Sequence, residues 1–155
     1  MRNLRTRPSK AGRVVYLIAT LVAWCNLQTW AATVSTQTFG RYEIMLQEGL
    51  PVAAGEILGT VRRQTGLPEY PLVLRTQQRT LELGILGPGN RPIRLASTTF
   101  TGPRGDKPAT VRFSVERSVR QDDTLTLWLR QVKASRQFSL ALDLRNLERM
   151  LEGPR

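Results

Sequence analysis

The sequence predicts an all-β protein: a single antiparallel β-sandwich (immunoglobulin-like or similar) of about eight strands with a short C-terminal helix, preceded by a signal peptide. Two observations predict the sandwich. Apolar and polar side chains alternate with a period of two through the last third of the chain. Turn-forming residues interrupt the chain about every ten residues, a spacing typical of sandwiches and barrels. The 155 residues suffice for one globular domain and are too few for two large ones.

Three strong strands are predicted in the last third, at 111–115, 124–130 and 137–144. In each segment every second residue is apolar and its neighbours are polar, the pattern of a strand with one buried face. The inward residues are Val111, Phe113 and Val115, then Leu125, Leu127 and Leu129, then Phe138, Leu140, Leu142 and Leu144.

Five weaker strands are predicted before them. Segments 41–46 and 79–86 alternate as above, and the short segments 57–62, 71–76 and 91–96 are bounded by turn residues. The predicted turns lie at 49–51, 66–68, 87–90, 102–108, 121–123 and 133–136.

One helix is predicted at the C-terminal end. Leu144, Leu147, Met150 and Leu151 recur at steps of three and four residues, and Gly153 followed by proline ends the pattern. The sandwich domain is expected over residues 40–155, with a flexible N-terminal segment at 32–39.

The first 31 residues have the pattern of a signal peptide. Five basic residues and no acidic one precede the uncharged run 14–27, which at 14 residues is shorter than the roughly 20 needed to span a bilayer. Thr29 and Ala31 predict cleavage between Ala31 and Ala32. The chain is therefore expected to be exported, to a bacterial periplasm, a thylakoid lumen or the cell exterior.

Two other interpretations of this segment stay open. An uncleaved anchor could extend over 14–32, with the basic residues held inside by the positive-inside rule, and the membrane contact would then be through this segment alone. Lipid attachment at Cys25 is disfavoured, because Trp24 stands where a lipoprotein signal has a small residue.

The composition removes many kinds of chemistry. The chain has no histidine, and its single cysteine is Cys25, so imidazole catalysis and His/Cys metal sites lack their ligands. No cofactor and no metal site are predicted, and the protein is expected not to be an enzyme. The enzyme alternative is a metal-free glycan hydrolase with two catalytic carboxylates. No pair of carboxylates is marked for this role. Asp122 and Asp123 are adjacent but belong to a predicted turn, and Glu43 and Glu82 fall on the outward faces of predicted strands.

The remaining functional indication is basic charge. Five of the 23 basic residues lie in the leader, which leaves 18 basic against 12 acidic residues and a net charge of +6. Most of these are arginines, which suit bidentate contact with carboxylate, phosphate or sulfate. The predicted function is binding of an acidic envelope protein, a polysaccharide or a lipid headgroup through an arginine-rich face. The predicted binding residues are Arg62, Arg63, Arg117, Arg120 and Arg130.

Two other classes of function were weighed against this one. Nucleic acid is not the expected partner, because exposed aromatic residues that could stack on bases are few, Trp128 foremost among them. A structural envelope subunit is the third class, and an exposed apolar patch or an unpaired sheet edge would favour it.

Two stretches carry a family resemblance. Residues 42–66, YEIMLQEGLPVAAGEILGTVRRQTG, and residues 111–142, VRFSVERSVRQDDTLTLWLRQVKASRQFSLAL, resemble the opening strands and the paired closing strands of a family of exported cyanobacterial proteins, domain-of-unknown-function family 2808. The resemblance implies an exported all-β fold and no assigned activity.

Mass spectrometry of the exported protein tests the leader prediction. The expected N-terminal residue is Ala32, because the cut after Ala31 has small side chains at both positions that the peptidase reads. An intact N-terminus in the membrane fraction would instead establish the anchor.

Overall fold

The computed structural model describes residues 33–100 and 111–153. These residues form two antiparallel sheets and one short C-terminal helix, so the predicted all-β sandwich is confirmed. The predicted signal peptide, its cleavage site and the predicted turn at 102–108 lie outside the described residues.

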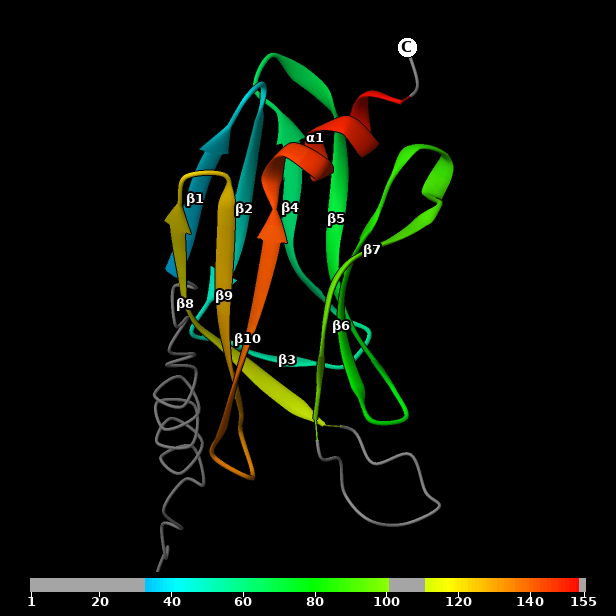
Figure 1. The fold of residues 1–155 in the computed structure, drawn as a ribbon. Coiled ribbons are helices and arrows are strands. Elements are labelled where there is room, and N and C mark those ends of the chain that lie inside the picture. Colours follow the sequence, from blue (N-terminus) through cyan, green and yellow to red (C-terminus); the bar gives the residue numbers. More distant parts are fainter. Residues whose placement is uncertain (1–32, 101–110, 154–155) are drawn as a thin grey trace, which may run out of the picture. The chain divides into compact units, whose positions relative to one another are not determined.

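The larger sheet, called sheet A, has six strands in the order β1-β2-β4-β5-β6-β7 (Figure 1). All its neighbouring strands pair antiparallel. A short 3-10 turn, Pro88–Asn90, joins β6 to β7 within the predicted turn at 87–90. The strands are β1 Thr33–Phe39, β2 Tyr42–Glu48, β4 Ile57–Arg63, β5 Gly66–Gln77, β6 Thr80–Leu86 and β7 Pro92–Thr99.

The smaller sheet, called sheet B, has four strands in the order β10-β9-β8-β3. The three strong strands predicted from alternation form its centre and one edge. The strands are β3 Pro51–Ala53, β8 Arg112–Gln121, β9 Thr124–Gln131 and β10 Arg136–Asp143.

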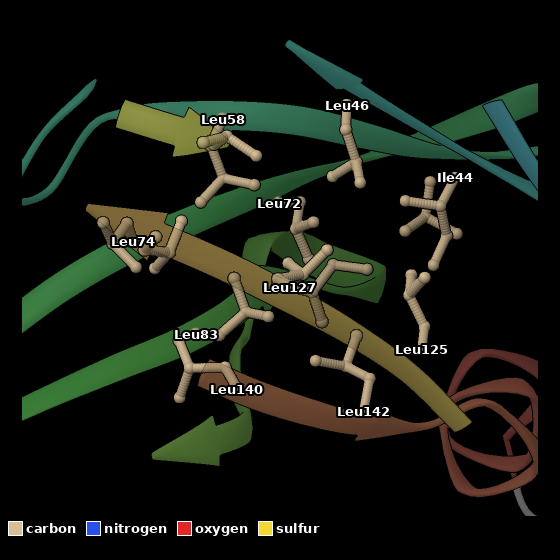
Figure 2. Close-up of a cluster of buried hydrophobic side chains, with 14 of the residues drawn as sticks. Ile44, Leu46, Leu58, Leu72, Leu74, Leu83, Leu125, Leu127, Leu140 and Leu142 are labelled. Carbon is tan, nitrogen blue, oxygen red and sulfur yellow. The ribbon is translucent and has the colours of Figure 1, made fainter. Parts of the chain in front are cut away.

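One apolar core lies between the sheets (Figure 2). Leu125, Leu127 and Leu129 are fully buried, as alternation predicts, and they share a cluster with leucines of sheet A such as Leu72 and Leu83. Each buried leucine contributes about 2 kcal/mol relative to exposure. The core therefore joins the two sheets into one folding unit.

Three segments differ from the sequence prediction. Residues Thr33–Phe39, expected to be flexible, form β1, which pairs with β2 over its whole length. Its side chains are mostly exposed, so the strand has no apolar alternation to reveal it. Pro51–Ala53, in and after a predicted turn, forms β3. The turn predicted at 66–68 lies inside β5, which is longer than the strand predicted at 71–76. With β1 and β3 added, the described residues form ten strands rather than about eight.

The predicted helix is present as α1, Leu144–Glu152. The Asp143 side chain caps it by accepting a hydrogen bond from the Asn146 N–H at 2.9 Å, and Gly153 ends it with a positive φ of 75°. Leu144, Leu147 and Leu151 are buried, whereas Met150, predicted on the same stripe, is exposed.

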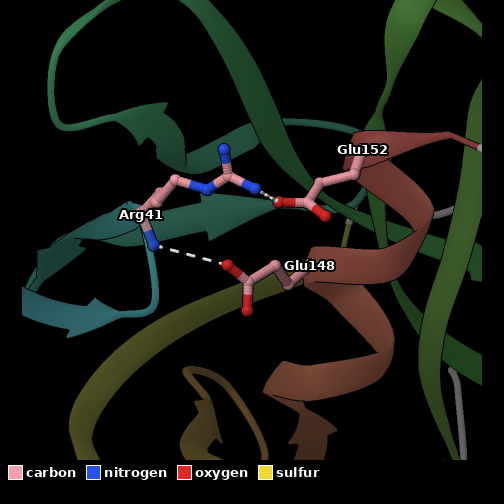
Figure 3. A network of polar contacts seen from close by, with 3 residues as sticks. All are labelled: Arg41, Glu148 and Glu152. Carbon is pink, nitrogen blue, oxygen red and sulfur yellow. Dashed lines mark hydrogen bonds and ion pairs between the residues drawn. The ribbon is translucent and has the colours of Figure 1, made fainter. Parts of the chain in front are cut away.

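The helix is tied to the turn between β1 and β2 (Figure 3). Arg41 pairs with Glu152, and the Arg41 backbone N–H donates to Glu148 Oε1 at 3.4 Å. Exposed ion pairs of this kind contribute little individually, so the buried leucines of α1 supply most of its docking energy.

Gly59 lies where β4 closely approaches β2 in sheet A. It lies opposite Leu46 at an irregularity in the pairing of β4. A Cβ atom there would lie 2.3 Å from the Met45 carbonyl oxygen, a backbone atom that cannot move alone.

The substitution Gly59→Ala is therefore expected to destabilise the fold by about 3 kcal/mol, because β2 and β4 must separate. Gly89→Ala is the matched control: φ at Gly89 is 68°, but nothing lies within 4 Å of its Cβ position. It should cost only about 1 kcal/mol of backbone strain. Urea denaturation measures both, and an equal cost for the two variants would contradict the close approach.

Candidate functional site

The five arginines predicted to bind lie on both sheets. Arg62 and Arg63 end β4 in sheet A, Arg117 and Arg120 lie on β8, and Arg130 lies on β9 in sheet B. The structure therefore does not bring all five onto one face. It brings Arg117 and Arg130 together on the outer face of sheet B.

Arg62 belongs to a row of charges across sheet A. It is paired in register with Glu43 on β2 and with Glu69 on β5, and its Nε donates to Glu43 Oε2 at 3.1 Å. Cross-strand pairs of opposite charge stabilise a sheet. The position of Arg62 therefore serves mainly to pair charges between strands of sheet A. Its neighbour Arg63 lies at the end of β4, opposite Tyr42.

The Arg120 side chain is hydrogen-bonded to the turn that follows it. Its Nε donates to the Asp122 carbonyl oxygen at 2.9 Å. Asp122 has a φ of 50°, so the predicted turn at 121–123 is present, and this contact helps to hold its shape.

A β-bulge creates the candidate site on sheet B. Val115 is opposite Leu129, but the next pair is Arg117 with Trp128, so Glu116 is the extra residue. The bulge reverses the alternation of β8 and places Arg117 on the outer face. The Arg117 guanidinium carbon lies 4.8 Å from the centre of the Trp128 ring, a cation-π contact.

The outward residues around this pair form a surface that we call the Trp128 face. Because Leu125, Leu127 and Leu129 are buried, the alternate residues of β9 point outward. The register sets residues of both neighbouring strands beside this row, among them Arg117 opposite Trp128 and Gln137 opposite Arg130. The Trp128 face consists of Thr124, Thr126, Trp128 and Arg130 on β9, Arg117 on β8 and Gln137 on β10.

Polar contacts fix one side of this face. Arg130 pairs with Glu116, and Gln137 Nε2 donates to the other oxygen of the same carboxylate at 2.9 Å. Arg117, in contrast, has no carboxylate within ion-pair distance among the residues that the structure describes. Its charge is therefore available to a ligand.

Charge changes along the face. Beyond Arg130, the β9–β10 hairpin carries the basic residues Lys133 and Arg136. Arg112 is also near this end, because its backbone carbonyl accepts a hydrogen bond from the Val132 N–H at 2.9 Å. The opposite end is the acidic turn of Asp122 and Asp123. An anionic ligand would thus be attracted to the Arg117 and hairpin end.

A hollow of about 490 Å³ adjoins the Trp128 face at the acidic turn. Two of its residues, Thr124 and Thr126, also belong to the face. Asp123 there is paired with Arg145 of the helix. The lining residues are Gln121, Asp122, Asp123, Thr124 and Thr126, all hydrogen-bonding groups.

Sheet A carries a smaller hollow near its β6–β7 turn and, elsewhere, a buried tyrosine. The hollow, about 390 Å³, lies between Pro68–Tyr70 and Leu86–Asn90, and its one charged residue is Glu69. Burial raises the pKa of the Tyr42 hydroxyl above its ordinary value of 10.0, and nearby Tyr70 and Glu152 add to the rise. Tyr42 stacks on Phe39 in the core and thus serves packing.

Within 33–100 and 111–153, no group of three or more histidine, cysteine, aspartate or glutamate residues could hold a metal ion. None of the helices in these ranges is long and apolar enough to cross a membrane.

Fold and surface together define a β-sandwich with a basic and aromatic platform on one sheet. Comparison of the chain with models of known families, with curated proteins and with solved structures finds no match. The Trp128 face is therefore the feature of the chain from which a function is inferred.

Proposed function

We propose that the protein is an exported, non-enzymatic binding protein whose Trp128 face binds an anionic polysaccharide. The observation that carries the proposal is the stacked pair of Arg117 and Trp128, with the arginine unpaired by any described carboxylate. The resemblance to the exported cyanobacterial family 2808 accords with export and is part of the proposal.

The aromatic and hydroxyl groups favour a glycan over the other acidic partners. An aromatic ring packs on the apolar C–H side of a sugar while its surroundings supply hydrogen bonds to hydroxyl groups. Thr124, Thr126 and Gln137 supply these groups beside Trp128. A lipid surface would favour a larger group of exposed apolar side chains than the two large aliphatic ones beside this face. These are Val119 on β8, opposite Thr126, and Val132 in the β9–β10 hairpin.

The arginines supply the preference for acidic sugars. A guanidinium contacts a carboxylate or sulfate through two parallel N–H groups, and stacking on Trp128 reduces the freedom that Arg117 loses on binding. Arg130 shares its charge with Glu116 and is expected to contribute less.

Affinity electrophoresis in gels containing polygalacturonate, with neutral dextran as the reference polymer, tests the proposal. Trp128→Ala and Arg117→Gln should each weaken retardation by polygalacturonate about tenfold or more, as for central binding residues. The Arg117→Gln variant should also lose part of the salt dependence.

Arg62→Gln is the matched control, because it removes one exposed arginine from the other sheet and should leave retardation within about twofold. Equal losses in Arg62→Gln and Arg117→Gln would contradict a defined face and indicate net charge alone. Binding to anionic vesicles or an acidic protein with no binding to polygalacturonate would also refute the glycan assignment.

One observation favours the enzyme alternative enough to test it. Asp122 and Asp123 both line the hollow beside the Trp128 face. If the protein shortened polygalacturonate, and Asp122→Asn abolished the shortening, the hydrolase alternative would replace the binding proposal.

A further inference from the structure

The edges of the two sheets are protected unequally. Exposed sheet edges invite pairing with another strand, and proteins usually blunt them with charges, proline, bulges or covering elements. Strands β7 and β10 lie against each other, and β3 has only three residues and begins with Pro51. The free part of β8 carries Arg117 and Arg120.

Among the residues that the structure describes, strand β1 has none of these protections. Its seven residues, TVSTQTF, include no charge, no proline and no glycine, and its pairing with β2 runs without a bulge. In the described part of the chain, β1 is the end strand of sheet A, so no strand pairs with its other edge. Its backbone donors and acceptors on that side are available to a partner.

The strand is nevertheless firmly held. Seven consecutive residues pair with β2, and Phe39 is buried against Tyr42. The Ser35 and Ser118 hydroxyl oxygens are 2.8 Å apart, which ties β1 to sheet B, and Ser118 also donates to Glu48. A regularly paired, uncharged edge is suited to strand addition.

We propose that the partner is a second copy of this chain, whose β1 pairs antiparallel with β1 about a two-fold axis at Thr36. This register uses all seven residues and places Val34 opposite Thr38, Ser35 opposite Gln37 and Thr36 opposite its own copy. No like charges face each other, and the exposed Val34, at 58 per cent, gains a threonine neighbour. Because the contact is the same on both copies, it closes as a dimer.

The symmetry gives the dimer a functional geometry. An antiparallel pair keeps each side chain on its own face of the sheet. The two copies of sheet A would therefore form one continuous sheet, and both copies of sheet B would lie on the same side of it. If the glycan proposal is correct, two Trp128 faces would contact one polymer, which increases avidity without new contacts.

Disulfide crosslinking tests the register. The single native cysteine is removed by Cys25→Ser in the full chain. Thr36→Cys should form a disulfide-linked dimer under mild oxidation, because the two positions are directly opposite, within the roughly 7 Å that a disulfide tolerates.

Thr38→Cys is the matched control on the same strand and face. Its two copies would be about 14 Å apart, so it should not crosslink with itself. A mixture of Val34→Cys and Thr38→Cys chains should crosslink to each other. Equal crosslinking of Thr36→Cys and Thr38→Cys would overturn the register.

Sedimentation equilibrium of the cysteine-free full chain tests the dimer itself. Thr36→Lys places two lysines opposite each other and should raise the dimer dissociation constant about fivefold or more, whereas Thr38→Lys faces Val34 and should change it less. A protein that is monomeric at about 100 μM would overturn the proposal. Neither result depends on glycan binding, so the two proposals fail separately.

Discussion

The structure depends on the burial of alternate leucines between two sheets. Leu125, Leu127 and Leu129, at alternate positions of β9, are fully buried, and alternate residues of β5 and β6 such as Leu72, Leu74 and Leu83 are buried with them (Figure 2). The part of the chain that follows the predicted leader contains no cysteine and, in its described residues, no metal cluster, so this apolar core must outweigh the entropy of ordering the chain. The aromatic cluster of Phe100, Phe113 and Phe138, with ring centroids 6.0 to 6.4 Å apart, extends it.

The same alternation produces the surface on which the function is proposed. With leucines of β9 facing inward, Thr124, Thr126, Trp128 and Arg130 must face outward in one row. The bulge at Glu116 then brings Arg117 beside Trp128. The core and the face proposed to bind are thus two sides of one strand.

The sequence alone was sufficient to predict the parts of the fold in which apolar and polar residues alternate strongly. Residues 111–144 and the leucine spacing of α1 predicted three strands and the helix, since burial of one face leaves a period in the sequence. Strand β1 could not be predicted, because most of its side chains are exposed and its position depends on pairing with β2. The grouping of the arginines could not be predicted either. A bulge depends on pairing across strands, and the adjacent charges Glu116 and Arg117 in an otherwise alternating strand were its only trace.

The most direct test of a shared core is methyl NMR of the protein labelled at leucine. The structure predicts nuclear Overhauser effects between the methyl groups of Leu125, Leu127 and Leu129 in β9 and those of leucines in β5 and β6, such as Leu72, Leu74 and Leu83, because all belong to one buried cluster. Contacts within each set but none between the sets would mean that the two sheets do not pack on each other, and would contradict the account.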